Sequence, residues 1–117
     1  MRLNEISYEG ARPIDGYGPG FFRVAGQVHE GAALVTATGV ARWGGMTDVE
    51  ALLALKGEVD VIFVGTGPAI TPLPKALREA LEEAGVGVEP MDTPAACRTY
   101  NVLLAEGRRI AVALIPV

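Results

Sequence analysis

Residues 59–67 read Val-Asp-Val-Ile-Phe-Val-Gly-Thr-Gly, and this stretch decides the class of fold. Residues 59–64 are almost continuously β-branched or aromatic, which is typical of a strand that is buried on both faces of a sheet. Gly65 and Gly67 then end the strand. A strand of this kind needs parallel neighbours, so the following segments should return the chain to the same sheet.

The chain beyond residue 67 alternates between helical and extended patterns. Apolar residues at helical spacing lie between Pro74, which can start a helix, and Gly85, which can stop one. Thr93 and Pro94 supply a cap and a first-turn proline for a second helix. The predicted elements are a helix over 74–84, a strand over 86–89, a helix over 94–105 and a strand over 109–115. With the strand over 59–64 they form two right-handed βαβ crossovers, which predicts an α/β fold.

The first part of the chain has the pattern of strands and turns. Its segments are a cluster of helix breakers at 14–20, a strand at 21–24, a turn at 26–31 and further strands at 32–38 and 39–43. Because short turns separate these strands, we expect them to pair in antiparallel fashion. Thr47 and Glu50 have the spacing of a capping box and predict a helix over about 48–55.

The composition indicates a globular chain. Half of the 117 residues are hydrophobic, which suits one packed core, and we expect a single domain over 1–117. The net charge of -4 shows no basic face, which argues against nucleic acid and against attraction to anionic lipid. No apolar run approaches the roughly 18 residues of a membrane span, so we expect no direct insertion. A start without a signal-peptide pattern and a single cysteine favour a cytoplasmic location.

A ligand would bind where the carboxyl ends of parallel strands meet the amino ends of the following helices. Gly65, Thr66 and Gly67 lie at this edge, and their amides can form a nest for an anion. A dinucleotide fingerprint needs a glycine where the chain has Ile70, and Pro68 removes one amide donor. The other interpretation is a turn that only reverses the chain.

Cys97 is the only residue whose chemistry suggests a nucleophile. A position near the amino end of a helix and next to Arg98 would lower the pKa of its thiol. A lone cysteine among alanines is more often a small core residue, and we favour that interpretation. The sole histidine, His29, lies in a predicted turn without a group to orient it.

Other polar and aromatic residues allow two interpretations each. Glu89 and Asp92 could act as an acid/base pair if they faced one cleft, but Asp92 and Thr93 more simply cap a helix. Trp43, Phe21 and Phe22 mark either a contact surface or, more commonly, the core. One histidine and one cysteine, without carboxylates at ligand spacing, give no metal site. We therefore expect no metal, no cofactor and no catalytic residue.

Residues 89–104 read Glu-Pro-Met-Asp-Thr-Pro-Ala-Ala-Cys-Arg-Thr-Tyr-Asn-Val-Leu-Leu. Together with residues 65–67, the turn at 17–18 and the closing residues 113–116, they resemble a small bacterial, archaeal and mitochondrial family. This family includes assembly factor 3 of NADH:ubiquinone oxidoreductase, respiratory complex I. The pattern Met-Asp-Thr-Pro-x-Ala-x-x-Thr-Tyr-Asn at 91–101 carries the specificity. The resemblance implies a three-layer α/β fold with a central mixed sheet, helices on one side and extra N-terminal antiparallel strands on the other.

The resemblance also implies a function. The mitochondrial relative is a matrix protein that works with a partner assembly factor on the membrane-associated part of complex I. The absence of a targeting extension favours a bacterial source for this chain. We therefore expect a non-enzymatic module that binds proteins and reaches the membrane only through them. The alternative is a binding protein or enzyme for an anionic small molecule, with candidate ligand residues Gly65, Thr66, Gly67, Asp92, Thr93 and Arg98 around a cleft between Thr66 and Arg98.

Overall fold

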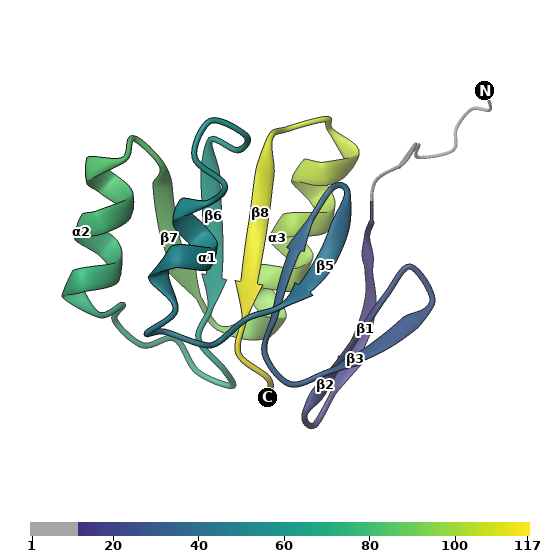
Figure 1. The fold of residues 1–117 in the computed structure, drawn as a ribbon. Coiled ribbons are helices and arrows are strands. Elements are labelled where there is room, and N and C mark those ends of the chain that lie inside the picture. The colour runs from purple at the N-terminus through teal and green to yellow at the C-terminus, as the bar shows by residue number, and fades with distance from the viewer. Residues whose placement is uncertain (1–11) are drawn as a thin grey trace.

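The computed structural model describes residues 12–117, in which eight strands form two sheets and three helices pack against them (Figure 1). The strands are β1 Ile14–Gly18, β2 Phe21–Val24, β3 Gln27–Glu30, β4 Ala33–Thr36, β5 Gly39–Arg42, β6 Val61–Gly65, β7 Gly87–Met91 and β8 Ile110–Leu114. The helices are α1 Val49–Leu53, α2 Lys75–Glu83 and α3 Thr93–Ala105. None of the helices in the described range is long and apolar enough to cross a membrane.

The larger sheet has the strand order β5-β4-β8-β6-β7. Strand β6 pairs in parallel with β7 on one side and β8 on the other, while β4 pairs antiparallel with β5 and β8. The predicted α/β fold, with a central mixed sheet and two crossovers, is therefore confirmed. The strands lie one or two residues from the predicted bounds near 59–64, 86–89 and 109–115.

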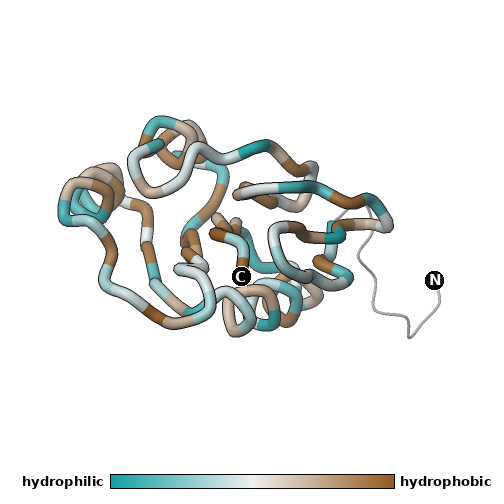
Figure 2. The backbone as a smooth tube through the Cα atoms, turned by 90° about the horizontal axis from the view of Figure 1, so that it is seen from below, coloured by the Kyte–Doolittle hydropathy of each residue, from teal (hydrophilic) through white to brown (hydrophobic). Residues whose placement is uncertain are grey.

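The two faces of the large sheet carry different layers. Helices α1 and α2 cover one face, over a core that includes Trp43, Leu52 and Leu77. Helix α3 and the three-stranded sheet β1-β2-β3 cover the other face, over a core that includes Phe22 and Tyr100. Helices are therefore present on both sides of the sheet, whereas the resemblance implied only one (Figure 2). The extra antiparallel N-terminal strands share the side of α3.

The small sheet contains two strands that the sequence did not predict. Residues 14–18, which look like a cluster of breakers, form β1, and the predicted turn over 26–31 contains β3. The real turn is shorter, because Ala25 and Gly26 both have positive φ, at 49° and 82°. Two such residues form a tight hairpin loop whose twist matches that of the flanking strands. Asn-Gly at these two positions would have predicted the hairpin turn, but the chain has alanine at the first of them.

One helix cap differs by one residue from the prediction, and the other falls on one of the two predicted residues. Asp48, and not Thr47, caps α1, since its carboxylate accepts a hydrogen bond from the amide of Ala51 at 3.3 Å. Asp92, and not Thr93, caps α3 by accepting a bond from Ala95 at 2.8 Å. The hydroxyl of Thr93 is therefore free for another use.

Of the three aromatic residues that the sequence singled out, Phe22 and Trp43 lie in the core, whereas Phe21 is only partly buried. Phe22 is fully buried, and Trp43 is 2% exposed. The indole N–H of Trp43 donates to the carbonyl of Asp48 at 3.1 Å, which satisfies its polar atom inside the core. The interpretation as core residues is confirmed for Phe22 and Trp43, which do not mark a contact surface.

Candidate functional site

The strand ends converge as the βαβ topology predicts. Strand β6 ends at Gly65, which lies opposite Met91 at the end of β7 and opposite Leu114 at the end of β8. Helix α3 begins at Thr93, two residues beyond the end of β7. Five of the six candidate residues, Gly65, Thr66, Gly67, Asp92 and Thr93, belong to this junction.

Thr93 is the centre of the junction and is fully buried. Its hydroxyl accepts a hydrogen bond from the amide of Gly67 at 2.9 Å and donates one to the carbonyl of Ile115 at 2.7 Å. Its own amide donates to the carbonyl of Gly67 at 2.8 Å. A single side chain thus joins the loop after β6, the end of β8 and the start of α3.

Gly65 is required at this point because α3 comes so close to the sheet. A Cβ atom at position 65 would lie 2.8 Å from the Thr93 hydroxyl and 2.9 Å from Cδ2 of Leu114. Real Cβ atoms do not tolerate such distances, so any larger residue would push the helix away. Gly67 has a φ of +106°, a conformation that side chains with a Cβ rarely adopt.

Thr66 organises the loop that follows the strand. Its amide donates to the carbonyl of Met91 at 2.8 Å. Its hydroxyl accepts a bond from the amide of Thr71 at 3.0 Å and lies 2.7 Å from the carbonyl of Ala69. The amides of Thr66 and Gly67, which the sequence presented as an anion nest, therefore both donate within the protein. An anion would bind to them only by displacing the carbonyl of Met91 and the hydroxyl of Thr93.

Arg98 points to a different part of the surface. It is exposed on α3 and lines a shallow hollow together with Thr99, Val102 and Leu103. Within residues 12–117 it makes no hydrogen bond to the strand ends. The structure therefore brings together five of the candidate residues but does not place Arg98 among them.

Cys97 lies in the core, on the side of α3 that faces the large sheet. It is 4% exposed, and burial raises the pKa of its thiol to about 12, against an opposing effect of Arg98. The thiol is therefore protonated near neutral pH, and a protonated thiol is a poor nucleophile. The environment of Cys97 fits the role of a core residue.

Sequence reasoning assigned no role to Tyr100 and Asn101, although both belong to the 91–101 pattern. The side chain of Asn101 accepts a bond from the amide of Ile14 at 2.9 Å and donates one to the carbonyl of Ile14 at 2.7 Å. It therefore binds β1 as a neighbouring strand would. Tyr100 is fully buried, and its hydroxyl has no hydrogen-bond partner among the described residues. Residues 93, 97, 100 and 104 have the spacing of one helix face, and this spacing was the sequence signal that could have indicated their burial.

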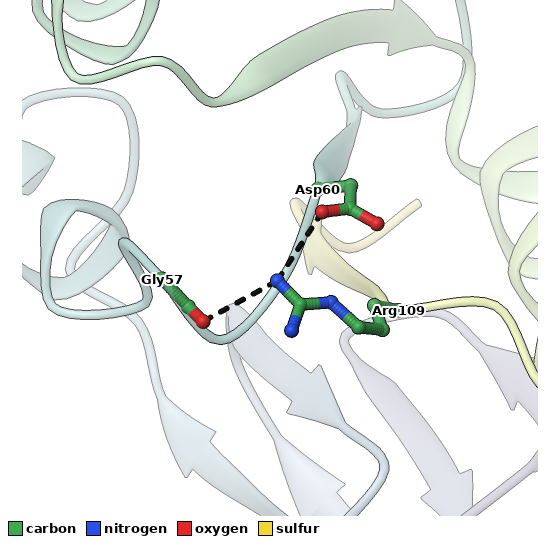
Figure 3. Close-up of polar contacts among 3 residues, drawn as sticks. All are labelled: Gly57, Asp60 and Arg109. Atoms are coloured by element: carbon green, nitrogen blue, oxygen red, sulfur yellow. Dashed lines mark hydrogen bonds and ion pairs between the residues drawn. The ribbon is translucent and has the colours of Figure 1, made fainter.

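The remaining chemistry-bearing residues lie apart from this junction. His29 is in β3, and Glu89 is exposed on β7. At the opposite end of the sheet, Arg109 Nη2 donates to the carbonyl of Gly57 at 3.3 Å and to Asp60 at 3.2 Å (Figure 3). Residues 12–117 contain no group of three or more side chains that could hold a metal ion.

These layers and the junction at the strand ends define a class of small three-layer α/β domain. Solved bacterial structures have the same fold. The crystal structure of an outer membrane protein from Bartonella henselae matches with a TM-score of 0.83 and 37% identity, over 92% of this chain and 97% of that one. A Mth938-like domain from Bordetella pertussis matches with a TM-score of 0.79 and 31% identity, over 99% and 92% of the two chains.

The chain belongs to the family described as protein of unknown function (DUF498/DUF598), which matches residues 14–115. An uncharacterised protein of Rhodobacter capsulatus is 53% identical over 99% of this chain and 94% of its own length. The human NADH dehydrogenase (ubiquinone) 1 alpha subcomplex assembly factor 3 is 31% identical over 98% of this chain and 67% of its own length. In the Danio rerio protein of the same name, the match spans 63% of the length at 36% identity. The resemblance to the assembly-factor family is confirmed.

Proposed function

We propose that this protein is a non-enzymatic protein-binding module that acts in the assembly of a membrane complex such as respiratory complex I. The observation that carries the proposal is the use of the 91–101 pattern inside the protein. Asp92 caps a helix, Thr93 joins three elements and Asn101 binds β1. The residues that suggested the resemblance to the assembly-factor family therefore build a scaffold, and we place the activity on the surface of that scaffold.

The relatives support the assembly role. Two vertebrate relatives that align with at least 88% of this chain are named as assembly factors of NADH dehydrogenase. Those proteins are longer than this chain. That this chain binds the same kind of partner is therefore part of the proposal. Under this proposal the protein works in the cytoplasm and reaches the membrane through the subunits that it binds.

A deletion strain tests the assembly role directly. The strain should contain less assembled complex I, measured by native gel and by NADH oxidation of isolated membranes. The wild-type gene should restore both. The Cys97→Ser variant should restore them as well, because a buried protonated thiol does no chemistry. Normal complex I in the deletion strain would refute the proposal. Failed rescue by a folded, abundant Cys97→Ser protein would point to thiol chemistry instead.

The anionic-ligand alternative stays a prediction with its own test. It places a phosphate-bearing molecule at Gly65, Thr66 and Gly67, next to the amino end of α3, with Arg98 near the ligand. Titration with inorganic phosphate and with a nucleotide, followed by backbone amide NMR shifts, would reveal such a site. Shifts at Thr66, Gly67 and Arg98 together would support it. Shifts confined to another surface would contradict it.

A further inference from the structure

The two sheets end in four edge strands, and two of these carry features that block further pairing. On β7, the hydrogen bonds of Gly87 and Met91 are directed towards β6, so Pro90 faces outward and offers no amide. On β1, both backbone groups of Ile14 are occupied by the side chain of Asn101. These two edges are therefore protected from another strand.

Strand β5 has no such protection within the described residues. The bond from the amide of Trp43 to the carbonyl of Ala32, at 3.1 Å, fixes which residues bond to β4. Since hydrogen-bonded pairs alternate along an antiparallel ladder, the backbone groups of Val40 and Arg42 face outward from β5. This edge offers two donors and two acceptors to a further strand.

Strand β3 is open in the same way. The bond from the amide of Gly31 to the carbonyl of Gly20, at 2.9 Å, sets the alternation with β2. The backbone groups of Val28 and Glu30 therefore face outward. Both open edges line one hollow, whose walls include Val28, Glu30, Val40 and Arg42.

We infer that the hollow between β3 and β5 is the docking site for an extended, acidic segment of a partner protein, which pairs with β5 as an added strand. This inference rests on the proposed function and names the surface that performs it. An extended segment satisfies the outward backbone groups, whereas a helix, whose backbone groups bond internally, does not. Val40 and Arg42 then become cross-strand neighbours of the segment.

The charges select an acidic segment. Arg42 on β5 and Glu30 on β3 both line the hollow, and a segment that pairs with β5 has Arg42 as its cross-strand neighbour, whereas Glu30 belongs to the opposite wall. Arg42 lies on the wall of the hollow, on the same side of β5 as Val40, which packs partly against the core. A glutamate or aspartate opposite Arg42, next to a β-branched residue opposite Val40, is therefore the complementary pattern.

The probe for this site is a synthetic peptide with the repeat Val-Thr-Glu-Thr, in which valine and glutamate alternate along the face that meets Val40 and Arg42. Binding should shift the amide NMR signals of β5 and slow hydrogen exchange at Val40 and Arg42. The same peptide with lysine in place of glutamate should bind at least roughly tenfold more weakly. Absence of shifts in β5 at about millimolar peptide would overturn the inference. Shifts that depend on protein concentration without peptide would show a second copy in the site and would also overturn it.

Two matched proline variants test which edge is used. Val40→Pro removes an outward amide of β5 and leaves the bonds to β4 in place, so it should abolish peptide binding. Val28→Pro does the same on β3, where the side chain is 52% exposed, and should bind peptide within about twofold of wild type. Loss of binding in Val28→Pro alone would overturn the pairing with β5. If Val40→Pro fails to fold, Arg42→Glu replaces it and should reverse the preference to the lysine peptide.

Capture of partners from the host separates this inference from the proposed function. Tagged wild-type protein should retain a membrane-complex subunit, and Val40→Pro or Arg42→Glu should lose it. Retention by these variants would overturn the docking site and leave the assembly role standing. If the deletion strain assembles complex I normally, the assembly role fails, while the peptide titration still decides whether β5 accepts a strand.

Discussion

The hydroxyl of Thr93 donates a hydrogen bond to the carbonyl of Ile115 at 2.7 Å, across 22 positions of sequence. The same oxygen accepts a bond from Gly67, so the hydroxyl uses its only proton and one of its lone pairs. Both contacts lie where three strands end and a helix begins. Thr93 therefore holds the last strand against the loop after β6 and positions α3 on the sheet.

Replacing Thr93 with valine should destabilise the protein by about 2–4 kcal/mol, because the amide of Gly67 and the carbonyl of Ile115 lose their partner inside the protein. Thr93→Ser keeps the hydroxyl and should cost less. Urea unfolding followed by circular dichroism measures both. Thr99→Val, on the same helix, is the control and should change the free energy of unfolding little, because Thr99 has no side-chain hydrogen bond within the described residues. Equal losses in Thr93→Val and Thr99→Val would show that the hydroxyl contacts contribute nothing.

Replacing Gly65 with alanine should destabilise the protein by about 1–3 kcal/mol, because the new methyl group would meet Thr93 and Leu114. The matched control is Gly16→Ala in β1, where a Cβ atom would have no neighbour within 4 Å. Thermal unfolding compares the two variants with the wild type. A melting temperature that falls equally in both would contradict the close approach of α3 to the sheet.

Stability should decline as the pH rises from about 9 towards 12. The pKa of Cys97 is raised from 9.0 to about 12 by burial, so the folded protein keeps a proton that the unfolded chain releases above pH 9. The contribution of the thiol is complete below pH 9 and is lost through this window. Burial also raises the pKa of Tyr100, with the same sign. In Cys97→Ala, unfolding measured by urea at several pH values should show a shallower decline, and an unchanged slope would contradict the assignment.

Replacing Asn101 with alanine should release β1 from α3, because the two backbone groups of Ile14 lose their bonds. The expected cost is about 1–3 kcal/mol. Hydrogen exchange should quicken at Ile14 and in β1 while β6 and β8 stay protected. Asn101→Asp keeps only the acceptor and should give an intermediate effect. Uniform exchange changes across both sheets would show that Asn101 supports the whole fold and not this one contact.

The second half of the fold could be predicted from the sequence because its signals are local. The apolar run before Gly65 and the breakers at Pro74 and Gly85 define their elements without reference to distant residues. The exact place of the hairpin turn at Ala25 and Gly26 could not be predicted in this way, because alanine rarely adopts positive φ and the sequence suggested a longer turn over 26–31.

The sequence predicted where five of the candidate residues lie, but it did not predict that their polar groups bond within the protein. Gly65, Thr66, Gly67, Asp92 and Thr93 do lie together, because the topology alone brings the strand ends and the start of α3 to one edge. Their hydrogen bonds to distant carbonyls depend on the register of β8 against β6, which a single sequence does not contain. A polar residue that serves the fold therefore has the same sequence pattern as one that serves a ligand.

The position of β8 has a consequence for how the protein is made. This strand is the last of the described elements to be synthesised, yet it lies in the middle of the large sheet, between β4 and β6. Until it leaves the ribosome, the β4–β5 hairpin and the β6–β7 unit have no shared partner and both expose a strand edge. The large sheet is therefore completed in one late step. During synthesis the nascent chain itself exposes unpaired strand edges, as the substrate of a chaperone does.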